Sequence, residues 1–161
     1  MLRSVNMYYK KSNSKERGCS GLIYDPEKSN YFITDSYSFI RLNNNNNRDA
    51  KRIYDIKEAF GVNDRIKDSI VKHYNNVVNG GFNVILKNFK DIKENELIKD
   101  GGRRLMYVKE KNCYFNYDMI KRILNISDSK DATLYISKEN DYFLNICTNN
   151  SVAYLLCCKS Y

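Results

Sequence analysis

Residues 21–42 decide the fold prediction for this chain, and they read Gly-Leu-Ile-Tyr-Asp-Pro-Glu-Lys-Ser-Asn-Tyr-Phe-Ile-Thr-Asp-Ser-Tyr-Ser-Phe-Ile-Arg-Leu. Two apolar runs flank a turn, and a third run follows an acidic break. Asp25 and Pro26 favour the turn because proline fixes φ at its second position. The pattern therefore predicts an antiparallel meander of three short strands, at about 20–24, 31–34 and 38–42.

The closing third of the chain predicts more strands around a helix. Residues 105–124 read as strand, turn, strand and helix, and the helix is expected over 117–126 with Ile120, Ile123 and Leu124 on its apolar side. Tyr142, Leu144 and Ile146 alternate as they do in a strand with one buried face. Strands are therefore expected at about 132–137, 142–147 and 152–158.

Two local motifs resemble a known family. Thr34-Asp35 ends one strand before an apolar strand that carries an arginine, although Ser36 stands where the similar corner commonly has glycine; Phe115-Asn116 introduces the helix. In their order of elements, residues 20–42 and 104–160 resemble a single repeat of the bacterial DNA polymerase III beta sliding clamp, of phage or mobile-element type. The resemblance implies an α+β fold, mostly antiparallel sheet with two or three helices.

The middle of the chain fits this resemblance least well. Residues 43–47 are an asparagine run that predicts a loop. Helical spacing follows over 52–60 and most clearly over 62–78, a strand is expected at 82–86, and the apolar residues between 89 and 98 have weak helical periodicity. We therefore expect one domain over 1–161, with a less clamp-like insertion at about 43–100.

Composition narrows the function classes. The 161 residues include 27 Lys and Arg against 19 Asp and Glu, a net charge of +8 that favours an anionic partner. The five cysteines lack metal-ligand spacing and follow no secretory segment, so reduced thiols in the cytoplasm are expected. No apolar run is long enough for a membrane span. The lone His73 and the lack of phosphate-loop or nucleophile motifs predict no catalytic residues, no metal and no cofactor.

Candidate nucleic-acid contacts are cations on the two clearest helices and at one strand start. In the resembled family such helices line the DNA, where cations attract phosphates without reading sequence. The alternative is that the cations at 103 and 104 form a solvated edge that discourages strand pairing. The predicted set is Arg65, Lys67, Lys72, Arg103, Arg104, Lys121 and Arg122.

Two further surfaces are candidates. The last strand is expected to expose Tyr154, Leu156 and Cys158 in a row that contacts a protein partner. Aromatic and basic residues interleave closely at 8–11 and at 107–109, a pattern that suits base stacking, although most aromatic side chains are expected to fill the core.

Together these features predict a non-enzymatic, clamp-like accessory protein that binds DNA non-specifically, or a host or phage protein of replication or defence. The alternative is a protein inhibitor of a host nuclease or defence complex. A small enzyme is the third class. A ring of the resembled family needs six repeats and this chain supplies about one, so oligomers are possible.

Overall fold

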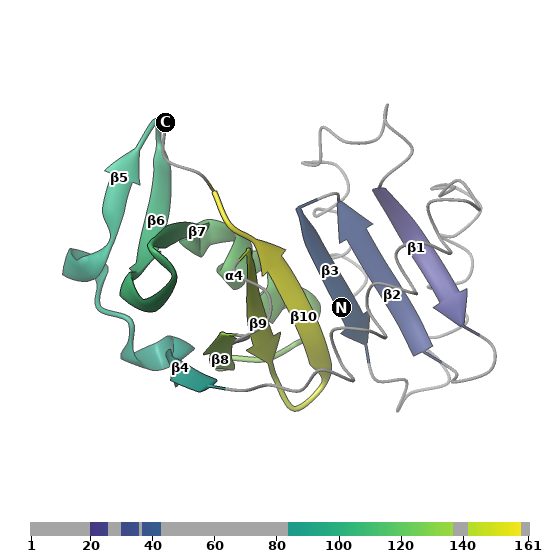
Figure 1. The fold of residues 1–161 in the computed structure, drawn as a ribbon. Coiled ribbons are helices and arrows are strands. Elements are labelled where there is room, and N and C mark those ends of the chain that lie inside the picture. Colours follow the sequence, from purple (N-terminus) through teal and green to yellow (C-terminus); the bar gives the residue numbers. More distant parts are fainter. Residues whose placement is uncertain (1–19, 26–29, 36, 43–83, 137–141, 159–161) are drawn as a thin grey trace. The chain divides into compact units, whose positions relative to one another are not determined.

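The computed structural model describes residues 20–25, 30–35, 37–42, 84–136 and 142–158, drawn in colour in Figure 1. The chain groups into two compact units, Met1–Gly81 and Phe82–Tyr161. The expectation of one domain over 1–161, with a less clamp-like insertion at about 43–100, stays a prediction.

The first unit contains an antiparallel meander, β1 (Ser20–Asp25), β2 (Asn30–Asp35) and β3 (Ser38–Leu42). This confirms the three strands predicted from residues 21–42. Ile33 on β2 lies opposite Ile40 on β3, and both side chains are fully buried. Alternate residues of β3 are buried, as expected for a strand with one face covered.

Four strands of the second unit pair antiparallel in the order β10, β9, β8, β4 (Figure 1). They are β4 (Val84–Asn88), β8 (Thr133–Ile136), β9 (Phe143–Cys147) and β10 (Ser151–Leu156). The strands predicted at 132–137, 142–147 and 152–158 are confirmed. One face of β8, β9 and β10 is buried and mainly apolar, and it consists of Leu134, Ile136, Leu144, Ile146, Ala153 and Leu155, with Ser151 at the start of β10.

The opposite face of these strands buries an amide. Asn145 on β9 lies between Tyr135 on β8 and Tyr154 on β10 and is 0% exposed. Neither polar atom of its side chain has a hydrogen-bond partner in the structure as described. Such a group is destabilising, because it has given up its bonds to water without replacement.

A smaller antiparallel sheet joins β5 (Ile98–Asp100), β6 (Arg103–Val108) and β7 (Cys113–Asn116). The hairpin between β5 and β6 has only Gly101 and Gly102 at its turn, with φ of 53° and 78°. Positive φ at both positions is what a two-residue turn between twisted strands requires. A 3-10 turn, η4 (Lys109–Lys111), connects β6 to β7 and ends at Asn112 with φ 47°.

The helix α4 (Tyr117–Ile126) follows β7 directly and packs against β6 and β10. Asn116 caps it: the side-chain oxygen accepts hydrogen bonds from the backbone N–H groups of Asp118 (3.0 Å) and Met119 (3.2 Å). Ile120 and Ile123, on the inner face of the helix, are fully buried. The predicted helix at 117–126 is therefore confirmed.

The prediction of an α+β fold with two or three helices is wrong. The described residues form ten strands and one α-helix, so this part of the chain is nearly all β. Residues 89–98, which had helical periodicity, form the 3-10 turns η2 (Phe89–Asp91) and η3 (Glu94–Glu96) and the start of β5. Extended backbone at Lys93 and Leu97 interrupts any helix there. The helices predicted at 52–60 and 62–78 lie outside the described residues.

Candidate nucleic-acid interface

Arg104 on β6 contacts two carboxylates and an aromatic ring. Its guanidinium donates from Nε to Asp118 Oδ1 (3.0 Å) and from Nη1 to Glu94 Oε1 (2.8 Å), and Nη2 also bonds Asp118. The guanidinium carbon lies 5.1 Å from the ring centre of Tyr117. Arg104 thus links β6, η3 and the first turn of α4, and a phosphate would have to displace a carboxylate to reach it.

The Arg104–Asp118 pair is ionised at neutral pH. Burial of the Asp118 carboxyl acts to raise its pKa, but the hydrogen bonds from the Arg104 side chain and backbone outweigh burial, so the pKa lies below its usual value. The hydrogen bond to Asp118 raises the pKa of Arg104 in turn. The one carboxylate on α4 is therefore already paired.

The outer face of α4 carries two of the predicted cations. Lys121 is exposed, and its Nζ lies 5.1 Å from the ring centre of Tyr117. Arg122 is half-buried and donates from Nη1 to Met119 Sδ (3.4 Å). Neither cation forms a salt bridge with a carboxylate in the part of the chain that the structure describes.

Tyr117 holds this arrangement in place. Its ring is nearly buried and stacks on Phe89, with ring centres 5.2 Å apart and planes 16° from parallel. Arg104 and Lys121 both approach the same ring. A cation over an aromatic face is attracted by the negative charge density of the ring, which favours this placement of Lys121.

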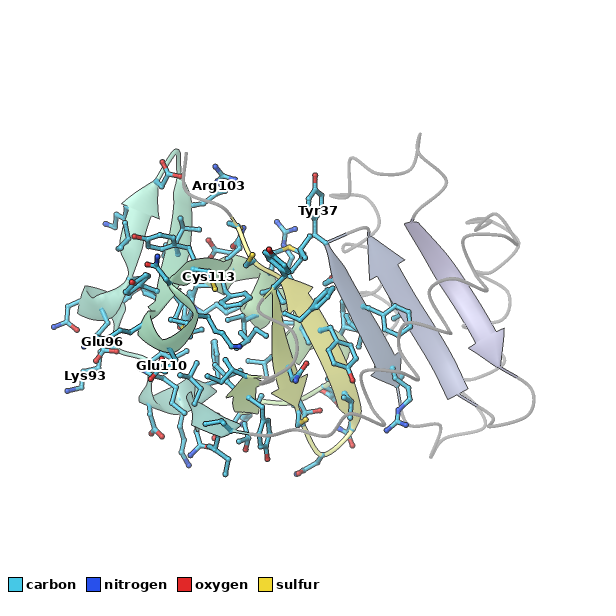
Figure 2. All side chains as sticks on the ribbon, in the orientation of Figure 1. Tyr37, Lys93, Glu96, Arg103, Glu110 and Cys113 are labelled. Atoms are coloured by element: carbon cyan, nitrogen blue, oxygen red, sulfur yellow. The ribbon has the colours of Figure 1, made fainter. Side chains whose placement is uncertain are left out.

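Arg103, the one remaining predicted cation that the structure describes, does not lie on this face. Arg103 extends from the β5–β6 hairpin, where it is exposed and lies 3.5 Å from the Asp100 carboxylate (Figure 2). The structure therefore places Lys121 and Arg122 together on α4, and Arg103 and Arg104 in succession on β6. Arg65, Lys67 and Lys72 lie outside the described residues, and the binding role of all seven stays a prediction.

Two other lysines of the second unit are held in ion pairs. Lys87 Nζ lies 3.2 Å from Glu96 Oε2, and Lys90 Nζ lies 3.5 Å from Asp131 Oδ2. Lys87 and Lys90 each form a salt bridge, whereas Lys121 forms none in the described part of the chain. Substituting Lys87 and Lys90 therefore removes the same charge from the protein without removing a cation that lacks a salt bridge, which makes these lysines controls for Lys121.

Two tyrosines lie side by side on the small sheet, and the sequence predicted a binding role for only one of them. Tyr107 on β6 lies opposite Tyr114 on β7, with ring centres 4.9 Å apart and planes inclined by 41°. Tyr107 is 41% exposed, and its hydroxyl donates to Asn112 Oδ1 (2.8 Å). The sequence singled out Tyr107 but not Tyr114. Tyr114 could have been found from the turn at 109–112. In a hairpin, residues at equal distances from the turn lie opposite each other, and Tyr107 and Tyr114 are each two residues from it.

The row predicted at the last strand is less open than expected. Tyr154 is only 4% exposed, so the prediction that it is exposed is wrong, while Leu156 and Cys158 are half-buried. The Cys158 N–H donates to the Tyr114 carbonyl (2.7 Å), which joins Cys158 to β7 by an isolated bridge. Burial raises the pKa of the Cys158 thiol, although nearby Arg103 acts to lower it. Partner binding by this row stays a prediction.

Within the described residues, no group of three or more His, Cys, Asp or Glu side chains is arranged to hold a metal ion. None of the helices in that same part is long and apolar enough to cross a membrane. Comparisons with protein-family models, with curated proteins and with solved structures found no match to this chain.

Proposed function

We propose that this chain is a non-enzymatic, clamp-like accessory protein that binds DNA through the outer face of α4. The observation that carries the proposal is the pairing of charges around that helix. Arg104 pairs with both Asp118 and Glu94, and Lys121 helps to lower the pKa of Asp118. Neither Lys121 nor Arg122 forms a salt bridge among the described residues, so three cations face two carboxylates. The face therefore presents net positive charge.

Such a face suits phosphates and not bases. Lysine and arginine contacts to phosphate release counterions, which gives affinity without reading sequence. The chain as a whole carries +8, so long-range attraction to a polyanion adds to these local contacts. The expected ligand is duplex DNA of any sequence, held by its backbone.

The clamp-like part of the proposal is supported by the order of elements. Strand, helix and three further strands follow one another as β7, α4, β8, β9 and β10. This is the order on which the resemblance to a sliding-clamp repeat rests. An accessory role for a phage or mobile element follows from the same resemblance, with assembly of several copies as its oligomeric consequence.

The test is fluorescence anisotropy with two labelled duplexes of equal length and unrelated sequence, over a series of salt concentrations. The proposal predicts equal affinity for both duplexes and a steady loss of affinity as salt rises. Absence of binding at the lowest salt, or affinity that does not change with salt, would remove duplex DNA as the ligand.

A further inference from the structure

The small sheet has one face whose aromatic side chains reach solvent. Tyr107 and Tyr114 are directly opposite on β6 and β7, so their side chains lie on the same face. Tyr107 is 41% exposed and Tyr114 is partly exposed. The hydrogen bond from the Tyr107 hydroxyl to Asn112 holds one edge of its ring, and the Tyr114 ring lies beside it with ring centres 4.9 Å apart.

The same face continues across the neighbouring strand. Leu105 lies two residues before Tyr107 and therefore on its side of β6, and its partner on β5 is Ile98. Leu105 is buried, whereas Ile98 is 45% exposed. The face thus carries exposed apolar surface at Ile98 on β5 and the tyrosine pair on β6 and β7, which lies beyond the last residue pair of β5 with β6.

Cations lie at both ends of the central strand. Arg103, at the start of β6, is on the same face as Tyr107 by strand alternation, and it is exposed, with Nη2 3.5 Å from the Asp100 carboxylate. Lys109 follows the end of β6 and is also exposed. Six residue steps separate these cations, about 20 Å along an extended strand. A cation therefore lies on each side of the tyrosine pair: Arg103, which is paired with Asp100, and Lys109, which forms no salt bridge among the described residues.

We infer that this face binds single-stranded nucleic acid, with a base stacked on Tyr107 beside Tyr114 and the phosphates near Arg103 and Lys109. Aromatic side chains next to cations bind single strands because every base has a flat π face. In a duplex those faces are covered by neighbouring bases, so the tyrosines cannot stack on them and the surface should bind a duplex weakly. The inference uses different residues from the α4 proposal and does not depend on it.

The chain has no tryptophan, so Tyr107→Trp places a single fluorescent reporter at the proposed stacking position. A single-stranded oligonucleotide is expected to quench this tryptophan in a saturable manner, while a duplex of the same length at the same concentration quenches it far less. Absence of quenching by the single strand at low salt would overturn the inference. Equal quenching by duplex and single strand would do the same.

Affinity measurements on variants distinguish the loss of a stacking ring from a loss of folded protein. Tyr107→Ala should weaken single-strand binding by about 5- to 150-fold, the usual range for loss of one stacked base. Tyr107→Phe keeps the ring, loses only the bond to Asn112, and should retain wild-type affinity. Tyr142→Ala removes another exposed tyrosine and is the control. Thermal unfolding of each variant checks that it folds.

The outcomes also distinguish the two proposals. Tyr107→Ala should leave duplex binding unchanged, because α4 is not altered. An unchanged single-strand affinity for Tyr107→Ala would refute the stacking site, and so would equal losses for the Ala and Phe variants. Loss of single-strand and duplex binding together, in a folded Tyr107→Ala variant, would also refute it.

Discussion

The cap of α4 gives a quantitative test of how this helix is held. Asn116 accepts two hydrogen bonds from N–H groups that have no partner inside the helix, at 3.0 and 3.2 Å. Asn116→Ala leaves both groups without a partner from the side chain. Because the residue is half-buried, water replaces the lost bonds only in part. The expected loss in free energy of unfolding is about 1 kcal/mol, within the range of about 0.5–2 kcal/mol for such caps.

For cooperative unfolding of the 161-residue chain this loss corresponds to a fall of about 2–4 °C in Tm. Differential scanning calorimetry measures it. Asn116→Ser keeps a side-chain acceptor and should recover most of the stability. Asn125→Ala alters an exposed position near the other end of α4 and should not lower Tm. An unchanged Tm for Asn116→Ala, or an equal fall for Asn125→Ala, would show that the cap does not stabilise the helix.

Two further predictions concern buried and ionised groups. Asn145→Leu replaces an unpaired buried amide by an apolar group of similar shape, and should raise the free energy of unfolding by about 1–3 kcal/mol in chemical denaturation; a loss would mean that the amide has a partner in solution. The pKa of Asp118 is lower in the folded protein than in the unfolded chain, where it is about 3.9. The ionised carboxylate therefore stabilises the fold at pH values above the unfolded-state pKa, and this contribution is lost as the pH falls through the folded-state pKa. Tm of Asp118→Asn should accordingly fall less steeply with acid than Tm of the wild type, and parallel curves would contradict the Arg104 pairing.

Sequence patterns predicted the elements whose apolar residues repeat with a clear period. Strand β3 and the helix at 117–126 each bury one side, so period and structure agree there, whereas β9 buries Leu144, Asn145 and Ile146 in succession and has both faces covered. Residues 89–98 had too few apolar positions to distinguish a helix from short turns. Of these positions Phe89 and Ile92 are buried, while Ile98 reaches solvent as part of β5.

The candidate site was harder to predict because charge alone does not reveal pairing. Arg104 and Lys121 look equivalent in the sequence, yet Arg104 bonds Asp118 and Glu94, which lie 14 and 10 residues away. These groups come together only because α4 and η3 both pack next to β6 in the folded chain. Tyr114 was missed for the same reason, since its value as a stacking residue depends on lying opposite Tyr107.

The central claim is that the cations of α4 contact DNA phosphates. The most direct measurement compares the salt dependence of duplex binding for the wild type, for Lys121→Gln with Arg122→Gln, and for a matched control with Lys87→Gln and Lys90→Gln. Each phosphate contact contributes about 0.9 to the slope of log affinity against log salt, so the α4 double variant should lower the magnitude of the slope by about 1.8. The control lysines are already paired with Glu96 and Asp131, so the control should keep the wild-type slope. An α4 variant with the wild-type slope, or a control that loses as much, would contradict the account.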